Sequence, residues 1–386
     1  MPRVVYERAE EKDFHDVVDF LDYVFSAAHA PTDFENLLPA LYSAEDFMSG
    51  VNYFVKEDNK IVANVGAYPA VYDVCGDKLK ITGITSVAVH PRARSKGYMK
   101  NLMKLALEDM KSDGTALSFL LGRRQRYEYF GFTPSGIMLK YNFNKNNFRH
   151  GKINVDDNSI ELRELSETDI NAFDEIFLRH NKQPARVERE RDKIAKIMKT
   201  WGNKAVGVYV NGVFTGYISA SKDYGEINEI NLDDPEMVLQ TIGVFSNRFN
   251  REDVGVLAYP HETALITRLA RLAESVSVSS VNCYNVLDYP AVLNAFLKLK
   301  LNSSPGSAPD GKVTIKIDDI CINIKISGGN ASVFYTDDAP DIECTRHEAA
   351  RLFFSPDSIF LARRFGNSFL NGILPVPLFI RKNDQS

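Results

Sequence analysis

The chain has 386 residues, of which 44% are hydrophobic and 25% charged, and its formal net charge is −5. A chain of this length exceeds a single packed core, so we expect two or three domains. The acidic balance argues against a nucleic-acid-binding protein, which needs a basic face to neutralise phosphates. No apolar run reaches the roughly 18 residues of a membrane helix. The first residues lack the apolar core of a signal peptide, and we expect a cytoplasmic protein without membrane contact.

The cysteines and histidines favour neither a metal site nor a disulfide framework. The four cysteines lie far apart with no C-x-x-C pair, and the seven histidines have no close ligand spacing. Close pairs of these residues would be the pattern of a bound metal. We therefore expect no metal, and free buried thiols.

The first part of the chain alternates strands and helices. The pair Asp58-Asn59 separates two apolar segments and predicts a hairpin turn. The nearly uninterrupted apolar run 116–121 predicts a strand buried on both faces. In chain order we expect strands at 4–6, 53–55, 61–72, 79–89 and 116–121, with helices from Asp13 and after Gly97.

Near residue 156 this pattern starts again. A strand at 160–163, a helix after residue 168 and a hairpin around the turn Asn211-Gly212 repeat the earlier order at nearly the same offset. The repeated spacing favours a duplicated α/β domain over a chance recurrence. Within this copy, the charge-dense segment 186–193 mixes both signs at helical spacing, which predicts a solvated helix face.

The pattern changes from about residue 284 to an α+β arrangement of about 100 residues, a common domain size. A helix at 290–300 and a Gly/Pro/Ser linker at 303–311 come first. Alternating strands at 313–317, 320–326 and 331–335 then precede helices at 347–354 and 356–363. We therefore expect domains at 1–155, 156–283 and 284–386.

The segment from Val87 to Met99 carries the most chemistry, because a strand runs through a turn into a helix there. The first amides of a helix and the helix dipole bind anions, and Gly97 lets the backbone approach an anion closely. Arg92, Arg94 and Lys96 add positive charge, so we expect a bound diphosphate. The segment matches neither G-x-G-x-x-G nor G-x-x-x-x-G-K-[ST], which argues against nucleotide hydride transfer and phosphoryl transfer.

This segment resembles the pyrophosphate loop of the GNAT acyltransferase superfamily, [RQ]-x-x-G-x-[GA] after a V-x-V strand. Arg94, Gly97 and Met99 stand at its three defined positions. Met99 departs from the usual Gly or Ala at the last position. A large apolar residue there resembles the enhanced intracellular survival (Eis) branch of the superfamily. That resemblance implies tandem GNAT-type folds, the second degenerate, then a sterol-carrier-protein-like α+β domain. It also implies acetyl-CoA as co-substrate, an amine acceptor such as an aminoglycoside, a polyamine or a lysine side chain, and a homo-oligomer, expected as a hexamer.

The resemblance implies cofactor contacts from the strand, the loop and the end of the next strand. These residues are Val87, Ala88, Val89, Arg94, Ser95, Lys96, Gly97, Tyr98, Met99, Lys100, Gly122 and Arg123. A backbone N–H of Val87 or Val89 would stabilise the thioester oxyanion, and the sequence leaves both open. In the second copy, we expect the counterpart of the loop at 257–266, which has neither a glycine at the helix start nor a basic cluster. We therefore expect no cofactor in that copy.

The segment 127–132 reads Tyr-Glu-Tyr-Phe-Gly-Phe and is similar to the family's Y-x-x-F-G-[FY] segment, in which the tyrosine is the proton donor. Transfer from a thioester expels a thiolate with a conjugate-acid pKa of ~8.5, which a tyrosine at ~10 can protonate. We therefore expect Tyr127 to be the general acid rather than only a packing residue. The Eis resemblance implies that the terminal carboxylate, here that of Ser386, is the base. Prolines and apolar residues in 374–380 favour a docked tail, whereas 381–385 is typical of a frayed end.

The expected function is N-acetyl transfer from acetyl-CoA by direct attack of a bound amine, without a covalent enzyme intermediate. A lipid-binding or scaffolding protein with a relic acyltransferase domain is the alternative from a different class. The two differ in whether the loop at Gly97 binds CoA.

Overall fold

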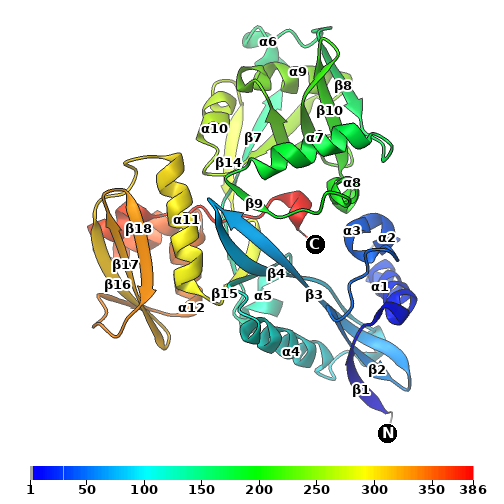
Figure 1. Ribbon diagram of the computed structural model, residues 1–386, viewed down its shortest axis with the longest axis vertical. Coiled ribbons are helices and arrows are strands. Elements are labelled where there is room, and N and C mark those ends of the chain that lie inside the picture. Colours follow the sequence, from blue (N-terminus) through cyan, green and yellow to red (C-terminus); the bar gives the residue numbers. More distant parts are fainter. Residues whose placement is uncertain (1–2, 29, 386) are drawn as a thin grey trace.

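The computed structural model describes residues 3–28 and 30–385, and these residues form three β-sheets (Figure 1). The first, sheet A, contains β1 (Val4–Arg8), β2 (Asn52–Glu57), β3 (Lys60–Val74), β4 (Asp77–Val89), β5 (Leu117–Leu120), β6 (Thr133–Ser135), β9 (Ala185–Val187) and β15 (Asn282–Val286). Its order is β1-β2-β3-β4-β5-β15-β6, and β9 also pairs with β3. Its helices are α1 (Phe14–Ala28), α2 (Phe34–Leu37), α3 (Pro39–Tyr42), α4 (Tyr98–Ser112) and α5 (Arg124–Tyr127). The hairpin expected at Asp58-Asn59 joins β2 to β3, and both turn residues have the positive φ that such a turn favours.

Sheet B lies above sheet A in Figure 1. Its strands are β7 (Met138–Asn144), β8 (Ile160–Glu164), β10 (Lys204–Val210), β11 (Val213–Ala220), β12 (Glu226–Leu232), β13 (Asp253–Ala258) and β14 (Ser275–Ser279). Their order is β14-β7-β13-β12-β11-β10-β8. The helices of this part are α6 (Lys145–His150), α7 (Ile170–Asn181), α8 (Ile194–Met198), α9 (Val238–Arg248) and α10 (Thr263–Ala270).

The two sheets repeat one strand order, which is the duplication that the sequence predicts. Sheet A runs β1-β2-β3-β4-β5 and sheet B runs β8-β10-β11-β12-β13, each antiparallel up to a final parallel pair. In sheet A, α4 connects the parallel pair, and in sheet B α9 does so. The counterpart of the loop before α4 is therefore 233–237, and the expected position at 257–266 is wrong. That loop reads Asp-Asp-Pro-Glu-Met, so carboxylates occupy the place of the basic residues.

Each copy is completed by a strand from elsewhere in the chain. β7 follows the first copy but lies in sheet B between β13 and β14, and β15 follows the second copy but lies in sheet A between β5 and β6. Sheet membership therefore does not follow the expected boundaries at 155 and 283. The reason is that periodicity along the chain identifies a strand without identifying its partners. The three-domain division stays a prediction.

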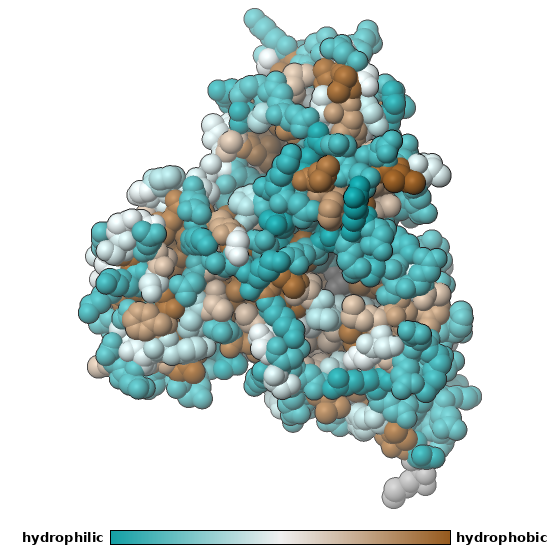
Figure 2. All heavy atoms as spheres, viewed as in Figure 1, coloured by the Kyte–Doolittle hydropathy of each residue, from teal (hydrophilic) through white to brown (hydrophobic). Residues whose placement is uncertain are grey.

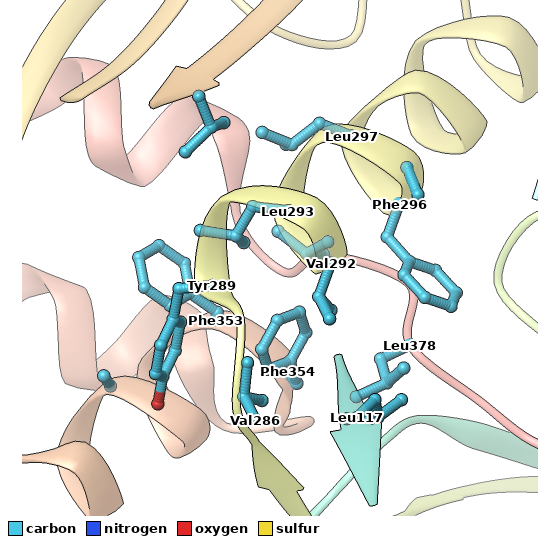
Figure 3. Packing of buried hydrophobic residues seen from close by; sticks show 14 of the residues in the cluster. Leu117, Val286, Tyr289, Val292, Leu293, Phe296, Leu297, Phe353, Phe354 and Leu378 are labelled. Atoms are coloured by element: carbon cyan, nitrogen blue, oxygen red, sulfur yellow. The ribbon is translucent and has the colours of Figure 1, made fainter. Parts of the chain in front are cut away.

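The C-terminal part contains a third sheet, ordered β18-β17-β16-β19. Its elements are α11 (Tyr289–Ser303), β16 (Gly311–Ile317), β17 (Ile320–Ser327), β18 (Asn330–Tyr335), β19 (Ile342–Cys344), α12 (Arg346–Phe354), α13 (Ser358–Ala362) and α14 (Ser368–Ile373). The meander and the helices expected here are confirmed. One apolar cluster continues from this sheet through α11 to sheet A, and Figure 3 shows Val292 and Phe296 of α11 near Leu117 of β5 and Leu378 of the tail. Among the described helices, none is long and apolar enough to cross a bilayer.

The tail runs back between sheets A and B and is buried along 376–381 (Figure 1). The hydroxyl of Tyr72 donates to the carbonyl oxygen of Phe379 at 2.7 Å. The Phe379 ring stacks on Tyr259, with centroids 4.4 Å apart. Asn383 and Gln385 are also buried. Of the two interpretations of the tail, the docked segment is confirmed as far as Gln385.

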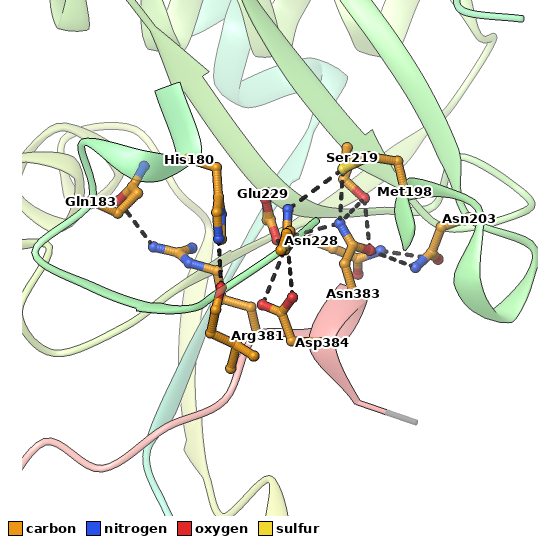
Figure 4. Close-up of polar contacts among 12 residues, drawn as sticks. His180, Gln183, Met198, Asn203, Ser219, Asn228, Glu229, Arg381, Asn383 and Asp384 are labelled. Carbon is orange, nitrogen blue, oxygen red and sulfur yellow. Dashed lines mark hydrogen bonds and ion pairs between the residues drawn. The ribbon is translucent and has the colours of Figure 1, made fainter. Parts of the chain in front are cut away.

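Buried charges hold the end of this tail (Figure 4). Arg189 donates to Glu229 of β12 at 2.8 Å and to Asp384 at 2.7 Å, and all three side chains are buried. Arg189 lies just after β9, so the solvated helix face expected at 186–193 is wrong. The two carboxylates, Glu229 and Asp384, come from segments that are distant in sequence from Arg189. The residues next to Arg189 in the sequence therefore do not predict these partners. Burial raises the pKa of Glu229, but the charges of Arg189 and Arg381 outweigh it and lower that pKa to about 2.

Replacing Arg189 with alanine is expected to destabilise the chain by about 3–5 kcal/mol, because two carboxylates stay buried without this cation. Urea unfolding checks this through the fluorescence of Trp201, the only tryptophan, which contacts the tail. Arg163→Ala is the control, since its pair with Glu161 is exposed and worth at most ~1 kcal/mol. Equal midpoints for the two variants would contradict a structural role for the buried cluster.

Candidate active site

A cavity of about 440 Å³ opens where two parallel strands stop pairing. The pairing of β4 with β5 ends at Ile84 and Leu120, whereas β4 continues to Val89. Four predicted site residues line the cavity: Val87, Gly122, Arg123 and Tyr127. The rest of the lining comes from Phe25, Thr32, Phe34, Leu37, Ile84, Thr85, Ser86, Leu121, Arg126 and Trp201. The strand ends thus bring residues from separate predicted motifs to one opening.

The backbone of β4 is irregular beside this cavity. Ser86 has a φ of +52°, and the register with β3 shifts between Asn64 and Gly66. Asn64 donates its side-chain amide to the Ser86 carbonyl at 3.0 Å, which fixes the irregularity. As a result Val87 has no ladder partner on β3 or on β5, whereas Val89 pairs with Ala63. His90 donates its N–H to the Val62 carbonyl at 2.8 Å, so Val89 and Ala63 form a non-hydrogen-bonded pair and the Val89 amide is not bonded to β3 either. Of the two candidate residues, Val87 is the one that lines the cavity.

The loop after β4 presents the start of α4. Gly97 is the N-cap with a φ of +80°, and no described side chain caps the helix. A Cβ at Gly97 would meet nothing within 4 Å, so glycine is needed for the backbone conformation and the approach is open. The next amides, at Tyr98, Met99 and Lys100, are the first of the helix and have no intrahelical acceptor. This end of α4 therefore has the geometry of an anion site.

The charges around this loop are mostly positive and exposed. Among the described residues, Arg94 has no ion-pair partner, and Ser95 beside it is also exposed. Lys96 instead pairs with Glu57 at 2.7 Å, and Tyr98 donates its hydroxyl to the same carboxylate. These two hydrogen bonds lower the pKa of Glu57. Lys96 is thus partly neutralised, and Arg94 is the freer cation next to the helix amides.

Tyr127 lies at the end of α5 with its ring against Gly122. A Cβ built on Gly122 would lie 2.3 Å from Cε2 of Tyr127, so the close packing requires glycine there. Tyr127 is buried, and burial raises the pKa of its hydroxyl. No hydrogen bond joins this hydroxyl to another described residue. Tyr127 lines the cavity, and a protonated hydroxyl without an internal acceptor can donate to a bound molecule.

Trp201 is a site residue that the sequence analysis missed. It follows α8 in the second copy, lines the same cavity, and donates its indole N–H to the Gln385 carbonyl at 2.8 Å. Its φ of +62° is unusual for a bulky residue, and such strain clusters at functional sites. Its only signal in the sequence is that it is the sole tryptophan.

A second cavity, of about 160 Å³, lies on the other side of the contact between Trp201 and Gln385. Neighbouring residues in the sequence line different cavities. Leu37 and Trp201 line the first cavity, and Leu38 and Thr200 line the second. The charged lining of the second cavity consists of four carboxylates and two cations, Asp46, Glu188, Glu190, Asp384, Arg189 and Lys193. Gln385 also lines it, so the described chain ends between the two cavities. Ser386, the predicted base, lies outside the described residues.

The other predicted contacts divide between the strand and the loop. Ala88 pairs with Asn64 and is buried against the cluster that includes α1, so its side chain faces away from solvent. Lys100 is exposed, with its ammonium 4.4 Å from the ring of Tyr129. In residues 3–28 and 30–385, no three His, Cys, Asp or Glu side chains are grouped as a metal ion would require.

Comparison with known proteins gives a family match for the first part of the chain and a shared fold for nearly all of it. Residues 5–135 match the family described as acetyltransferase (GNAT) domain. No curated protein matches the sequence. The structure is similar to a GCN5-related N-acetyltransferase from Kribbella flavida, with a TM-score of 0.67 and 17% identity over 97% of this chain and 96% of that one. It is also similar to a probable N-acyltransferase of unknown function from Enterococcus faecalis V583, with a TM-score of 0.68 and 16% identity over 98% of both chains.

Eis1 from Mycobacterium abscessus is a further structural relative, with a TM-score of 0.63 and 13% identity over 97% of this chain and 96% of that chain. These identities are low, so the likeness concerns the fold, including its tandem sheets and C-terminal part. The family match, in contrast, covers β1 to β6 and includes the loop at Gly97 and Tyr127. The chain therefore carries a GNAT acetyltransferase domain at residues 5–135, within an architecture that these solved proteins share over nearly its full length.

Proposed function

We propose that the protein is an N-acetyltransferase that moves an acetyl group from acetyl-CoA to an amine-bearing small molecule by direct attack. One observation carries the proposal: Tyr127, Gly122 and the unpaired backbone of Val87 face one cavity where β4 and β5 stop pairing. The GNAT domain match supplies the reaction class. The cavity lining includes Tyr127, the proposed acid, and Val87, the proposed oxyanion donor.

The residues of the loop fit an acyl-CoA. The first amides of α4 and the Arg94 guanidinium would hold its diphosphate, and Gly97 leaves the approach open. When bound, acetyl-CoA supplies a thioester, which is an activated acyl group. The Val87 N–H would donate to the carbonyl oxygen as negative charge develops there.

We assign both proton transfers to residues of this chain. The amine nitrogen forms a bond to the acyl carbon while the carbon–sulfur bond breaks. The proton of the amine goes to the carboxylate of Ser386, and the hydroxyl of Tyr127 gives its proton to the leaving thiolate. Tyr127 keeps that proton at neutral pH because the ordinary tyrosine pKa of ~10 lies well above 7, and burial raises it further. The four carboxylates of the second cavity already pair with cations, so the proposed amine acceptor rests on the acetyltransferase match.

Thiol release tests the proposal. Purified protein with acetyl-CoA and a panel of polyamines and aminoglycosides should release free thiol well above the hydrolysis blank for at least one acceptor. Calorimetry with CoA then separates the enzyme from a lipid-binding or scaffolding protein with a relic domain. A relic should bind CoA no better than a variant with a bulky residue at Gly97.

Replacing Gly122 with alanine is expected to lower kcat/KM by about 10²-fold, because the new methyl displaces the Tyr127 ring by an amount that matters for proton transfer. Gly151→Ala is the matched control. Its Cβ would lie 2.5 Å from a Leu272 methyl carbon, a similarly close contact with a residue that does not line the cavity. Steady-state kinetics give kcat/KM for both variants. An equal loss of kcat/KM in the two would mean that the Gly122 effect comes from general strain in the fold and not from displacement of Tyr127.

Adding residues after Ser386 is expected to lower kcat by about tenfold or more with little change in the affinity for acetyl-CoA, because the carboxylate is then moved from the attacking amine. The pH profile of kcat gives the second measurement, because loss of a general base changes the acidic limb of that profile. An extended chain with unchanged kcat would remove this role from Ser386. The hexamer, the sterol-carrier-like C-terminal domain and the cytoplasmic location stay predictions of the sequence resemblance.

A further inference from the structure

The edge strand of sheet B has an unusual composition. β14 reads Ser-Val-Ser-Val-Ser and pairs with β7 along one side only. All five of its residues are exposed, and Val276 and Val278 retain 52% and 51% of their accessible surface. Figure 1 shows β14 at the edge of sheet B beside α10. Among the described strands, no other pairs with its outer side.

Proteins usually protect such an edge with charges, prolines, bulges or short length. At the edges of the two copies in this chain, β1 carries Glu7 and Arg8, and β8 carries the ion pair Glu161–Arg163. β6 has only three residues and includes Pro134. β14 has no charge and no proline, and its register with β7 is regular. Its outer side is therefore suited to pairing with another strand.

We propose that β14 pairs with β14 of a second copy of this chain, antiparallel, about a two-fold axis at Ser277. The strand reads the same in both directions, so an antiparallel copy presents the same alternation at every position. Val276 then lies opposite the partner subunit's Val278. Beyond the strand, Glu274 lies opposite the partner subunit's Ser280, so no like charges meet.

The apolar face of the strand supports the same arrangement. Val276 and Val278 lie beside Tyr141 and Leu139 of β7, which belong to the core on one face of sheet B or pack against it. A second β14 would continue this face across the axis and cover the two valines. No residue of β14 lines either cavity, so this proposal stands or falls separately from acyl transfer.

Sedimentation velocity of the full chain tests the interface. The unchanged protein should form a dimer or a larger even-numbered assembly. Val276→Lys with Val278→Lys should halve its size or raise the dissociation constant by about tenfold or more, because cations then meet across the axis. Val213→Lys is the control, since Val213 is a valine away from this edge and is still more exposed, at 65%. A monomer at all concentrations, or an assembly that the double lysine variant leaves intact, overturns the proposal.

A cysteine at the axis tests the register without disturbing the edge. Ser277→Cys should form an intermolecular disulfide on mild oxidation, because two copies of residue 277 face each other directly. Ser275→Cys should not, since its expected partner is residue 279. The unchanged chain, oxidised in parallel, measures any contribution from its four native cysteines. Equal crosslinking of Ser277→Cys and Ser275→Cys, or none for either, would exclude the proposed pairing.

Discussion

Replacement of Tyr127 by phenylalanine should lower kcat by about 10²- to 10⁴-fold and leave the affinity for acetyl-CoA nearly unchanged. The ring that packs against Gly122 stays, and only the hydroxyl of this cavity-lining residue is lost. The leaving thiolate must then depart without a proton from the enzyme. Thiol release under saturating conditions gives kcat, and calorimetry with CoA gives the affinity.

Tyr129→Phe is the matched control, because Tyr129 lies two residues away and is 66% exposed. It should keep nearly full activity. The pH dependence gives an independent check. Since burial raises the pKa of Tyr127 above its ordinary value of 10, its proton is retained as the pH rises, and loss of this acid should not reduce kcat below pH 10. A Tyr127→Phe enzyme with normal turnover would remove the hydroxyl from the mechanism.

Replacement of Gly97 by valine should weaken binding of acetyl-CoA by about ten- to a hundredfold. The left-handed backbone at Gly97 aims the first amides of α4 at the anion site, and a β-branched residue does not hold that conformation without strain. Charge-assisted hydrogen bonds are worth about 1.5–3 kcal/mol each, so misplacing even one amide accounts for the loss. Calorimetry with CoA measures it directly.

The same helix offers a control at its other end. Gly114 follows α4 with a φ of +77°, and a Cβ there would also meet nothing within 4 Å. Gly114→Val should therefore cost similar stability, about 1–2 kcal/mol, without affecting CoA binding. If both variants lose affinity equally, the effect is one of helix stability and the anion site at Gly97 is not supported.

The sequence by itself determined the local features of this protein. Alternation and turn residues located the hairpin at Asp58-Asn59 and the C-terminal meander, because these depend on neighbours along the chain. The repeated order of elements was visible for the same reason. The loop at Gly97 and the position of Tyr127 followed from short motifs, whose spacing is set by one strand, one turn and one helix. The structure places Val87, Gly122, Arg123 and Tyr127 around one cavity.

Only the tertiary structure decided which distant segments meet. The exchange of β7 and β15 between the sheets has no local signal, since a strand fits either sheet by its own pattern. The mixed charges around Arg189 predict a solvated side chain, but in the structure it is buried and pairs with Glu229 and Asp384 from other parts of the chain. Trp201 enters the site through its bond to the docked tail. Periodicity reports which face of a segment is buried, whereas the partner that buries it is fixed by packing of the whole chain.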